Sequence, residues 1–148
     1  MNKDFQLSNF AYAVETSILD NRDVFPKEGN NITVTSNDIF DNEGNSLFKE
    51  PIPNGFEFIG ANYNDTTGTT VILCQDTNTG EILASCAGTS SYPGEKSKDV
   101  DNWFDIMSYG ISPYGEEVNS IINFFNQMGM YPSRISGHSL GGSVAQLV

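Results

Sequence analysis

Hydrophobic positions near the start of the chain recur at the spacing of an α-helix. Counted from the first of them, they fall at offsets 0, 3, 4, 7 and 11: Leu7, Phe10, Ala11, Val14 and Ile18. These offsets place the side chains on one helical face, because an α-helix has about 3.6 residues per turn. The pattern predicts a helix from about Ser8 to Leu19.

Residues 21–55 show no sustained hydrophobic period and are rich in Asn, Asp, Gly and Pro. We expect an irregular segment here, so that residues 1–55 form an N-terminal helix followed by irregular chain. Residues 41–45 suggest a calcium loop, but counting back from Gly44 as its sixth position places Ile39 where the first acidic ligand is required. A turn over 41–45 is therefore the better interpretation.

Residues 56–87 contain short runs of β-branched and aromatic residues. The runs 56–59, 69–74 and 81–86 are separated by two segments with turn composition, 64–68 and 76–80. Three consecutive strands with short turns between them are typical of an antiparallel meander. We expect this meander to form the first part of a sheet.

The last third of the chain alternates between helical and strand patterns. Ser112 and Pro113 form a helix N-cap and first position, Glu116 and Glu117 favour the first turns, and Gly129 ends the helix. Its period is kept by four apolar residues: Val118, Ile121, Ile122 and Phe125. A short strand, 134–136, follows, and a second helix begins at about Leu140, with Val144, Ala145 and Val148 facing inward. The fold class is therefore α/β, with all 148 residues in one domain.

Composition and charge limit the classes of partner and the cellular location that we expect. Seven basic and 19 acidic residues give a net charge of −12, which opposes binding to nucleic acid and to anionic bilayers. No run approaches the ~20 apolar residues of a membrane span, and the start of the chain lacks the apolar run of a secretory signal. We expect a cytoplasmic protein, or one exported by a route without such a signal.

Cys74 and Cys86 are the two cysteines of the chain. If a hairpin folds about residues 78–79, Cys74 lies opposite Leu83 and Cys86 lies opposite Val71. Three registers then separate the cysteines, which places their Cα atoms roughly 10 Å apart, beyond the ~7 Å limit for a disulfide. The sequence predicts two free thiols.

The pattern Gly-x-Ser-x-Gly occurs at residues 137–141, between a predicted strand and a predicted helix. Such a turn holds the hydroxyl of Ser139 clear of the sheet, and Gly137 and Gly141 avoid collisions that a Cβ atom would cause. The N-terminus of the following helix faces the charge that develops on a substrate oxygen. This context indicates a nucleophilic serine rather than a glycine-rich turn.

The segment Gly137-His138-Ser139-Leu140-Gly141-Gly142 resembles the nucleophile elbow of the class 3 lipases, the fungal-lipase-like branch of the α/β-hydrolases. Two further stretches are similar to segments of that family: Ala87-Gly88-Thr89-Ser90 and Asn102-Trp103-Phe104-Asp105-Ile106. The resemblance covers residues 56–148 and implies a partial α/β-hydrolase-like fold.

The resemblance also implies roles for single residues. Ser139 is the nucleophile, and the backbone N–H groups of Thr89 and Leu140 form the oxyanion hole. Trp103 lies near a lid or site mouth, or is an ordinary core aromatic. His138 is a packing residue beside the nucleophile rather than a base. The implied reaction is hydrolysis of a lipid-like acyl ester through an acyl-enzyme, which needs no metal and no cofactor.

One requirement of that family is not met by the sequence. In this fold the acid and the histidine of the triad follow the serine, yet residues 140–148 contain no Asp, Glu or His. We therefore expect the chain to be the front portion of a serine ester hydrolase, inactive by itself, with an open sheet edge that favours self-association or a completing chain. The alternatives are an inactive binding or structural module, and a peptidase or thioesterase of the same fold.

Overall fold

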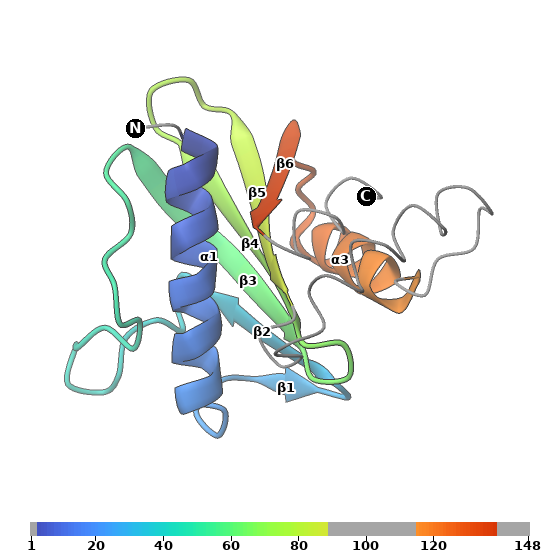
Figure 1. Cartoon of the computed structure of the whole chain (residues 1–148). Helices are drawn as coiled ribbons and strands as arrows, with labels where there is room; N and C mark the ends of the chain where they lie inside the picture. Colours follow the sequence, from blue (N-terminus) through green and yellow to red (C-terminus); the bar gives the residue numbers. More distant parts are fainter. Residues whose placement is uncertain (1–2, 89–114, 139–148) are drawn as a thin grey trace.

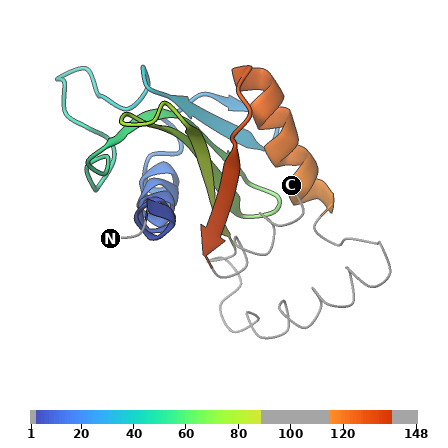
Figure 2. The same ribbon diagram turned by 90° about the horizontal axis from the view of Figure 1, so that it is seen from above.

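The computed structural model describes residues 3–88 and 115–138. Their elements follow the order α1, β1 to β5, α3 and β6, and the six strands form one mixed sheet in the order β1-β2-β3-β4-β5-β6 (Figure 1). The arrangement is of the α/β type, with α1 on one face of the sheet and α3 on the other (Figure 2). The fold class expected from the sequence is confirmed at this level.

Helix α1 spans Lys3–Asp20. It begins earlier than the predicted Ser8 and ends one residue after the predicted Leu19. All five residues of the predicted inner face are buried, with at most 2% of any side chain exposed. Phe10 makes edge-to-face contacts with Phe48 and Phe58, at centroid distances of 6.0 and 6.2 Å. The helix therefore joins the segment before the meander to the sheet through one apolar core.

The segment after α1 is more regular than its composition predicted. It contains β1, Lys27–Glu28, and β2, Asn31–Thr35, and β2 pairs antiparallel with β3. Ile32 and Val34 enter the core beneath α1 while Asn31 and Thr33 face the other side. The expectation of irregular chain throughout 21–55 was wrong here. The turn at 41–45 is confirmed, because Asp41 Oδ1 accepts hydrogen bonds from the N–H groups of Glu43 and Asn45.

The predicted meander is confirmed as strands β3, Phe56–Asn64, β4, Thr69–Asp76, and β5, Ile82–Gly88, each paired antiparallel with the next. Both turns are held by a side chain that accepts hydrogen bonds from the backbone. Asn64 Oδ1 accepts from Thr66 and Thr67, and Asp76 Oδ1 accepts from Asn78 and Thr79. The strands run further than predicted because these turns begin at the last strand residues.

The crossover from β5 to β6 passes through α3, Gly115–Met128. The predicted helix start at Ser112 and Pro113 lies outside the described residues. Gly129 ends the helix as predicted, with a φ of 68° and the Met130 N–H donating to the Phe125 carbonyl at 3.2 Å.

The inner face of α3 differs from the predicted one. Ile121 and Phe125 are buried as expected, whereas Ile122 is 38% exposed and Phe124 is buried in its place. The face is rotated because Phe124 enters the core against Val71 and Leu73. The side chain of Val118 is not described.

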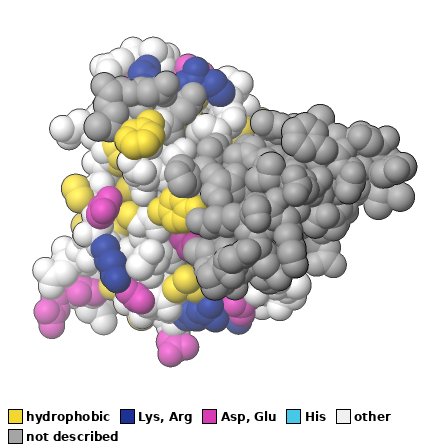
Figure 3. Space-filling view, viewed as in Figure 1, with side chains coloured by type: hydrophobic (Ala, Val, Ile, Leu, Met, Phe, Trp, Pro, Cys, Tyr) yellow, Lys and Arg dark blue, Asp and Glu magenta, His cyan; other side chains and the backbone are white. Residues whose placement is uncertain are grey.

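The two faces of the sheet carry separate cores. Against α1 lie inward residues of β2 to β5, among them Ile32, Ile72, Cys74 and Leu83. Against α3 lie Val71, Leu73, Ala84 and Cys86. Within residues 3–88 and 115–138 no helix has the length and apolar character needed to cross a membrane. On the described part of the face in Figure 3, acidic and basic side chains are interspersed and hydrophobic ones form separate small groups.

Candidate active site at the carboxyl ends of β5 and β6

Strand β6, Arg134–His138, is the parallel neighbour of β5. The register pairs Cys86 with Gly137 and Ala87 with His138, so the carboxyl ends of both strands meet at the same edge of the sheet. In open α/β sheets, ligands bind outside the carboxyl ends of the strands. The described residues of the two sequence motifs, Ala87–Gly88 and Gly137–His138, therefore lie at this same edge.

The backbone of the predicted elbow is described as far as His138. Gly137 and His138 are the last residues of β6, so the strand continues beyond its predicted end at Ser136 and leads directly to Ser139. Gly88 ends β5 and is followed by Thr89. Ser139, Leu140 and Gly141, together with Thr89, lie outside the described residues, as do Trp103 and the predicted last helix.

Serine side chains hold the start of β6 in register with β5. The Ser133 N–H donates to the Ile82 carbonyl at 2.9 Å, and Ser133 Oγ donates to Glu81 Oε1 at 2.8 Å. Three residues later, Ser136 Oγ donates to the Ala84 carbonyl at 3.4 Å. These contacts support the parallel pairing of β6 with β5 near the start of β6.

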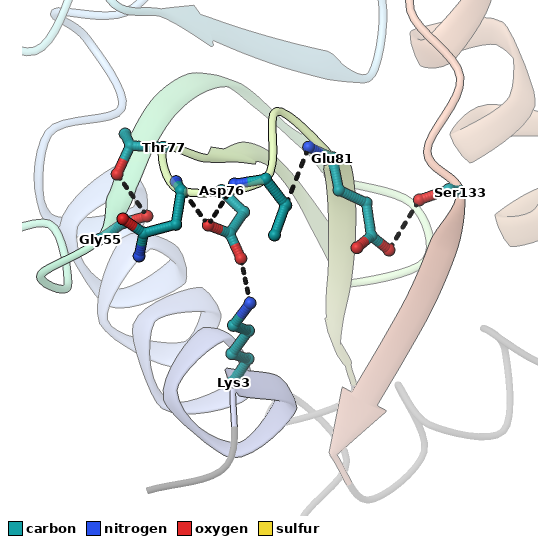
Figure 4. Close-up of polar contacts among 8 residues, drawn as sticks. Lys3, Gly55, Asp76, Thr77, Glu81 and Ser133 are labelled. Atoms are coloured by element: carbon teal, nitrogen blue, oxygen red, sulfur yellow. Dashed lines mark hydrogen bonds and ion pairs between the residues drawn. The ribbon is translucent and has the colours of Figure 1, made fainter.

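At the opposite end of the strands, where β4 leads into β5, polar contacts stabilise a turn (Figure 4). Asp76 is 1% exposed and forms an ion pair with Lys3 at the start of α1. The hydrogen bond from Lys3, followed by those from the Asn78 and Thr79 N–H groups, lowers the pKa of Asp76 below its usual value. Thr77 Oγ1 donates to the Gly55 carbonyl at 3.0 Å. We interpret this end of the sheet as structural.

A buried carboxylate lies near the candidate edge. Glu15 of α1 is 2% exposed, and its Oε2 accepts a hydrogen bond of 2.8 Å from Thr70 Oγ1. Thr70 pairs across the sheet with Ala87, which pairs in turn with His138. Burial and then the charge of Glu15 raise the pKa of Tyr12. The carboxylate is therefore held in the same row across the sheet as the last residue of β6.

Sequence analysis missed Glu15, although a signal was present. The residue stands at offset 8 from Leu7, which is a position of the same inner face as Leu7, Ala11 and Ile18. Only apolar residues were counted on that face. A glutamate at an inner position is rarely buried without a partner, and Thr70 supplies one.

Neither cysteine is a candidate nucleophile. Both are free thiols, as predicted, and the predicted pairs of Cys74 with Leu83 and of Cys86 with Val71 are confirmed. The two side chains also lie on opposite faces of the sheet. Burial raises the pKa of each thiol to about 12, so both stay protonated at neutral pH and lack the nucleophilic thiolate.

Among the residues that the structure describes, no three His, Cys, Asp or Glu side chains are grouped so that they could hold a metal ion. The described part of the candidate site comprises the paired ends of β5 and β6 and, in the same row across the sheet, the buried Glu15–Thr70 pair. No family model, no curated protein and no solved structure matches the chain.

Proposed function

We propose that the chain carries the nucleophile and the oxyanion hole of a serine ester hydrolase, with an α/β-hydrolase-like arrangement of its sheet. The observation that supports this most strongly is the register of β5 and β6, which pairs Ala87 with His138. Thr89 follows Ala87 by two residues and Ser139 follows His138 by one. The segments that the resemblance assigns to the oxyanion hole and the nucleophile thus leave the sheet side by side.

The proposed reaction has two steps. Ser139 Oγ attacks the carbonyl carbon of an acyl ester, its proton passes to a base, and the N–H groups of Thr89 and Leu140 stabilise the oxyanion. The alcohol leaves with a proton, and water then hydrolyses the acyl-enzyme to the carboxylic acid and free Ser139. Residues 140–148 hold no Asp, Glu or His, so none of the residues after Ser139 in this sequence can serve as the base or its orienting acid. The lipid-like acyl ester substrate follows from the family resemblance alone.

A second candidate function rests on the position of β6. Within the described residues β6 is the last strand of the sheet, so one of its sides has no strand partner there. An unpaired strand edge favours addition of another strand. This favours the alternative of a binding or structural module that a second chain completes, with Ser139 taking no part in catalysis.

A phosphonate that reacts with serine hydrolases separates the two functions. Ser139 Oγ would attack the phosphorus of a fluorophosphonate, fluoride would leave, and the serine proton would pass to solvent. An oxyanion hole accelerates acyl transfer by about 10³–10⁴ even where triad members are missing. We therefore expect slow labelling of the folded chain at Ser139, located by mass spectrometry of its peptides.

The matched variants are Ser139→Ala and Ser136→Ala. Labelling should disappear in the first and persist in the second, which removes a serine from the same strand–turn segment. Labelling at the same slow rate on many serines of native and urea-unfolded protein would contradict the hydrolase proposal and favour the completed module.

A further inference from the structure

The face of the sheet that carries α3 is only partly covered by this helix. Its apolar side chains pack on β4, β5 and the part of β3 around Ile59 and Gly60. Beside this contact, β2 and β3 turn four polar residues toward the same side: Asn31, Thr33, Asn62 and Asn64. Between these strands and α3 lies a cavity of about 290 Å³, and an adjoining hollow of about 370 Å³ shares Asn31, Ser120 and Asn123 with it. We call the two together the amide groove.

Asparagine is an unusual choice for these strand positions, because Asn is depleted in β-strands. Part of the explanation is structural. Asn31 lies opposite Asn64 and Thr33 opposite Asn62, and each pair is joined by a hydrogen bond, of 3.1 and 3.2 Å. Ser120 of α3 joins the first pair by donating to Asn31 Oδ1 at 3.1 Å. The side chains of the groove are thus held in fixed orientations before any ligand arrives.

These bonds leave part of the hydrogen-bonding capacity unused. Asn62 is 4% exposed and donates through Nδ2 to Thr33, and its Oδ1 has no donor among the described residues. Asn31 accepts two hydrogen bonds through Oδ1, and its Nδ2 has no acceptor among them. The side chain of Asn123, on the wall formed by α3, makes no hydrogen bond with a described residue. The groove therefore presents oriented donors and acceptors next to each other.

The charge of the lining limits the class of ligand. Among the described residues that line the two cavities, Glu28 alone is charged, although the chain carries a net charge of −12. A phosphate or carboxylate ligand would meet no cation, and a metal ion would meet one carboxylate. Phe124 is the one large apolar residue of the lining and is 1% exposed, so an apolar ligand would find little surface. What remains is an uncharged ligand with many hydroxyl groups.

We infer that the amide groove binds a neutral saccharide. Each hydroxyl of a sugar both donates and accepts, and two neighbouring hydroxyls can pair with the N–H and the carbonyl of one amide. The volume of about 290 Å³ lies at the lower end of small-molecule sites, which suits one or two sugar units. The described residues of the lining offer no open aromatic ring for stacking, so the affinity should be modest, with a Kd in the millimolar range. This inference does not depend on the role proposed for Ser139.

Saturation-transfer NMR on the 148-residue chain tests the inference. The probes are the methyl glycosides of glucose, galactose, mannose and N-acetylglucosamine, with glucuronate as an anionic probe and N-acetylglycine methylamide as a peptide-like one. We expect transfer to at least one neutral glycoside and none to glucuronate. The side-chain amide signals of Asn31 and Asn62 should shift on titration with the same glycoside.

The variants are Asn123→Ala, in the groove, and Asn9→Ala, at an exposed position of α1. Loss of one hydrogen bond predicts a roughly two- to tenfold higher Kd for Asn123→Ala and an unchanged Kd for Asn9→Ala. Three results would each overturn the inference. They are the absence of saturation transfer to any glycoside at millimolar concentrations, equal Kd values for the two variants, and binding of the peptide-like probe in place of the glycosides.

Discussion

Two adjacent threonines of β4 are both buried, yet their hydroxyl groups have different environments. Thr70 is fully buried and donates to the carboxylate of Glu15 at 2.8 Å. Thr69 is 4% exposed and faces the other side of the sheet, and its Oγ1 has no hydrogen-bond partner among the described residues. The same residue type therefore stabilises the fold at one position and costs desolvation free energy at the next.

Replacement of each threonine by valine, which has nearly the same shape, measures this difference. Thr70→Val removes the hydrogen bond from Thr70 Oγ1 to the buried Glu15 carboxylate and should lower the free energy of unfolding by about 1.5–3 kcal/mol. Thr69→Val removes an unsatisfied hydroxyl and should leave stability unchanged or raise it. Urea unfolding of both variants provides the comparison. Equal losses at the two positions would show that the Glu15–Thr70 bond contributes no net stability.

The buried cysteines predict a clear result with a thiol reagent. Because the pKa of each thiol is raised to about 12, the native chain should not react at neutral pH, whereas the denatured, unreduced chain should titrate two thiols. A native chain in which one thiol reacts at once, or a denatured chain with none, would contradict the assignment.

The same shifts predict a dependence of stability on pH. Each thiol binds its proton more tightly in the folded chain, whose pKa is about 12, than at the ordinary value of 9.0. The unfolded chain therefore binds fewer protons between these values, and the free energy of unfolding should fall as pH rises from 9 toward 12. Chemical unfolding at several pH values measures the slope, with a Cys74→Ala variant expected to show a smaller one.

Predictability from sequence differed among residues for physical reasons. The strand partners of the two cysteines followed from the position of one turn. Once the turn of a hairpin is placed, the alternation of side chains between the two faces of a strand leaves few possible pairings. The burial of Glu15 did not follow from a count of apolar residues, since its stability depends on a hydroxyl that arrives from β4, far away in sequence. Polar pairs of this kind require the tertiary structure.

At the scale of elements, the end of α3 depends on one glycine. Gly129 has a φ of 68°, and a Cβ atom added there would meet no heavy atom within 4 Å. Gly129→Ala should therefore cost backbone strain alone, about 1–2 kcal/mol in the free energy of unfolding. Gly129→Asn is the matched control and should lose less, because Asn adopts this conformation more readily. Thermal unfolding that ranks alanine equal to glycine would contradict this account of the helix end.

The helices and strands with a regular pattern of apolar residues were predictable from the sequence, whereas strands rich in polar residues were not. Helix α1 and strands β3 to β5 follow from their apolar patterns, whereas β2 contains only Ile32 and Val34 as apolar residues between Asn31 and Thr35. The inner face of α3 was predicted wrongly because the apolar pattern allows either Phe124 or Ile122 to face the sheet. In the structure the larger Phe124 packs against β4. Tertiary packing decided both cases.

At the scale of the whole molecule, the proposed function predicts little activity for the 148-residue chain, because residues 140–148 contain no Asp, Glu or His. We expect the 148-residue chain to hydrolyse short-chain p-nitrophenyl esters no faster than its Ser139→Ala variant, since disabling a triad typically costs about 10⁴–10⁶ in turnover. Light scattering should show association through the side of β6 that has no strand partner among the described residues. Ser139-dependent turnover well above background by a monodisperse monomer would contradict both expectations, and Asp99, Asp101 and Asp105 would then be the first residues to mutate as alternative bases.

The motif of the candidate site was predictable from the sequence, but the spatial relation between its two segments was not. The Gly-x-Ser-x-Gly pattern indicated Ser139 from five consecutive residues, yet its relation to Thr89 depends on the pairing of strands that are separated by α3 in sequence. Only the sheet register relates the two segments to each other. The proposed role of Ser139 therefore rests on the pairing of the last residues of β5 and β6.

The most direct measurement of that role is a crystal structure of the chain after reaction with a fluorophosphonate. The account predicts phosphorus bonded to Ser139 Oγ, with the phosphonyl oxygen about 2.7–3.1 Å from the backbone nitrogens of both Thr89 and Leu140. The Ser139 backbone should lie outside the ordinary helical and strand regions. An ordered adduct with Ser139 inside a regular helix, or with Thr89 more than twice a hydrogen-bonding distance from the phosphonyl oxygen, would contradict the central claim.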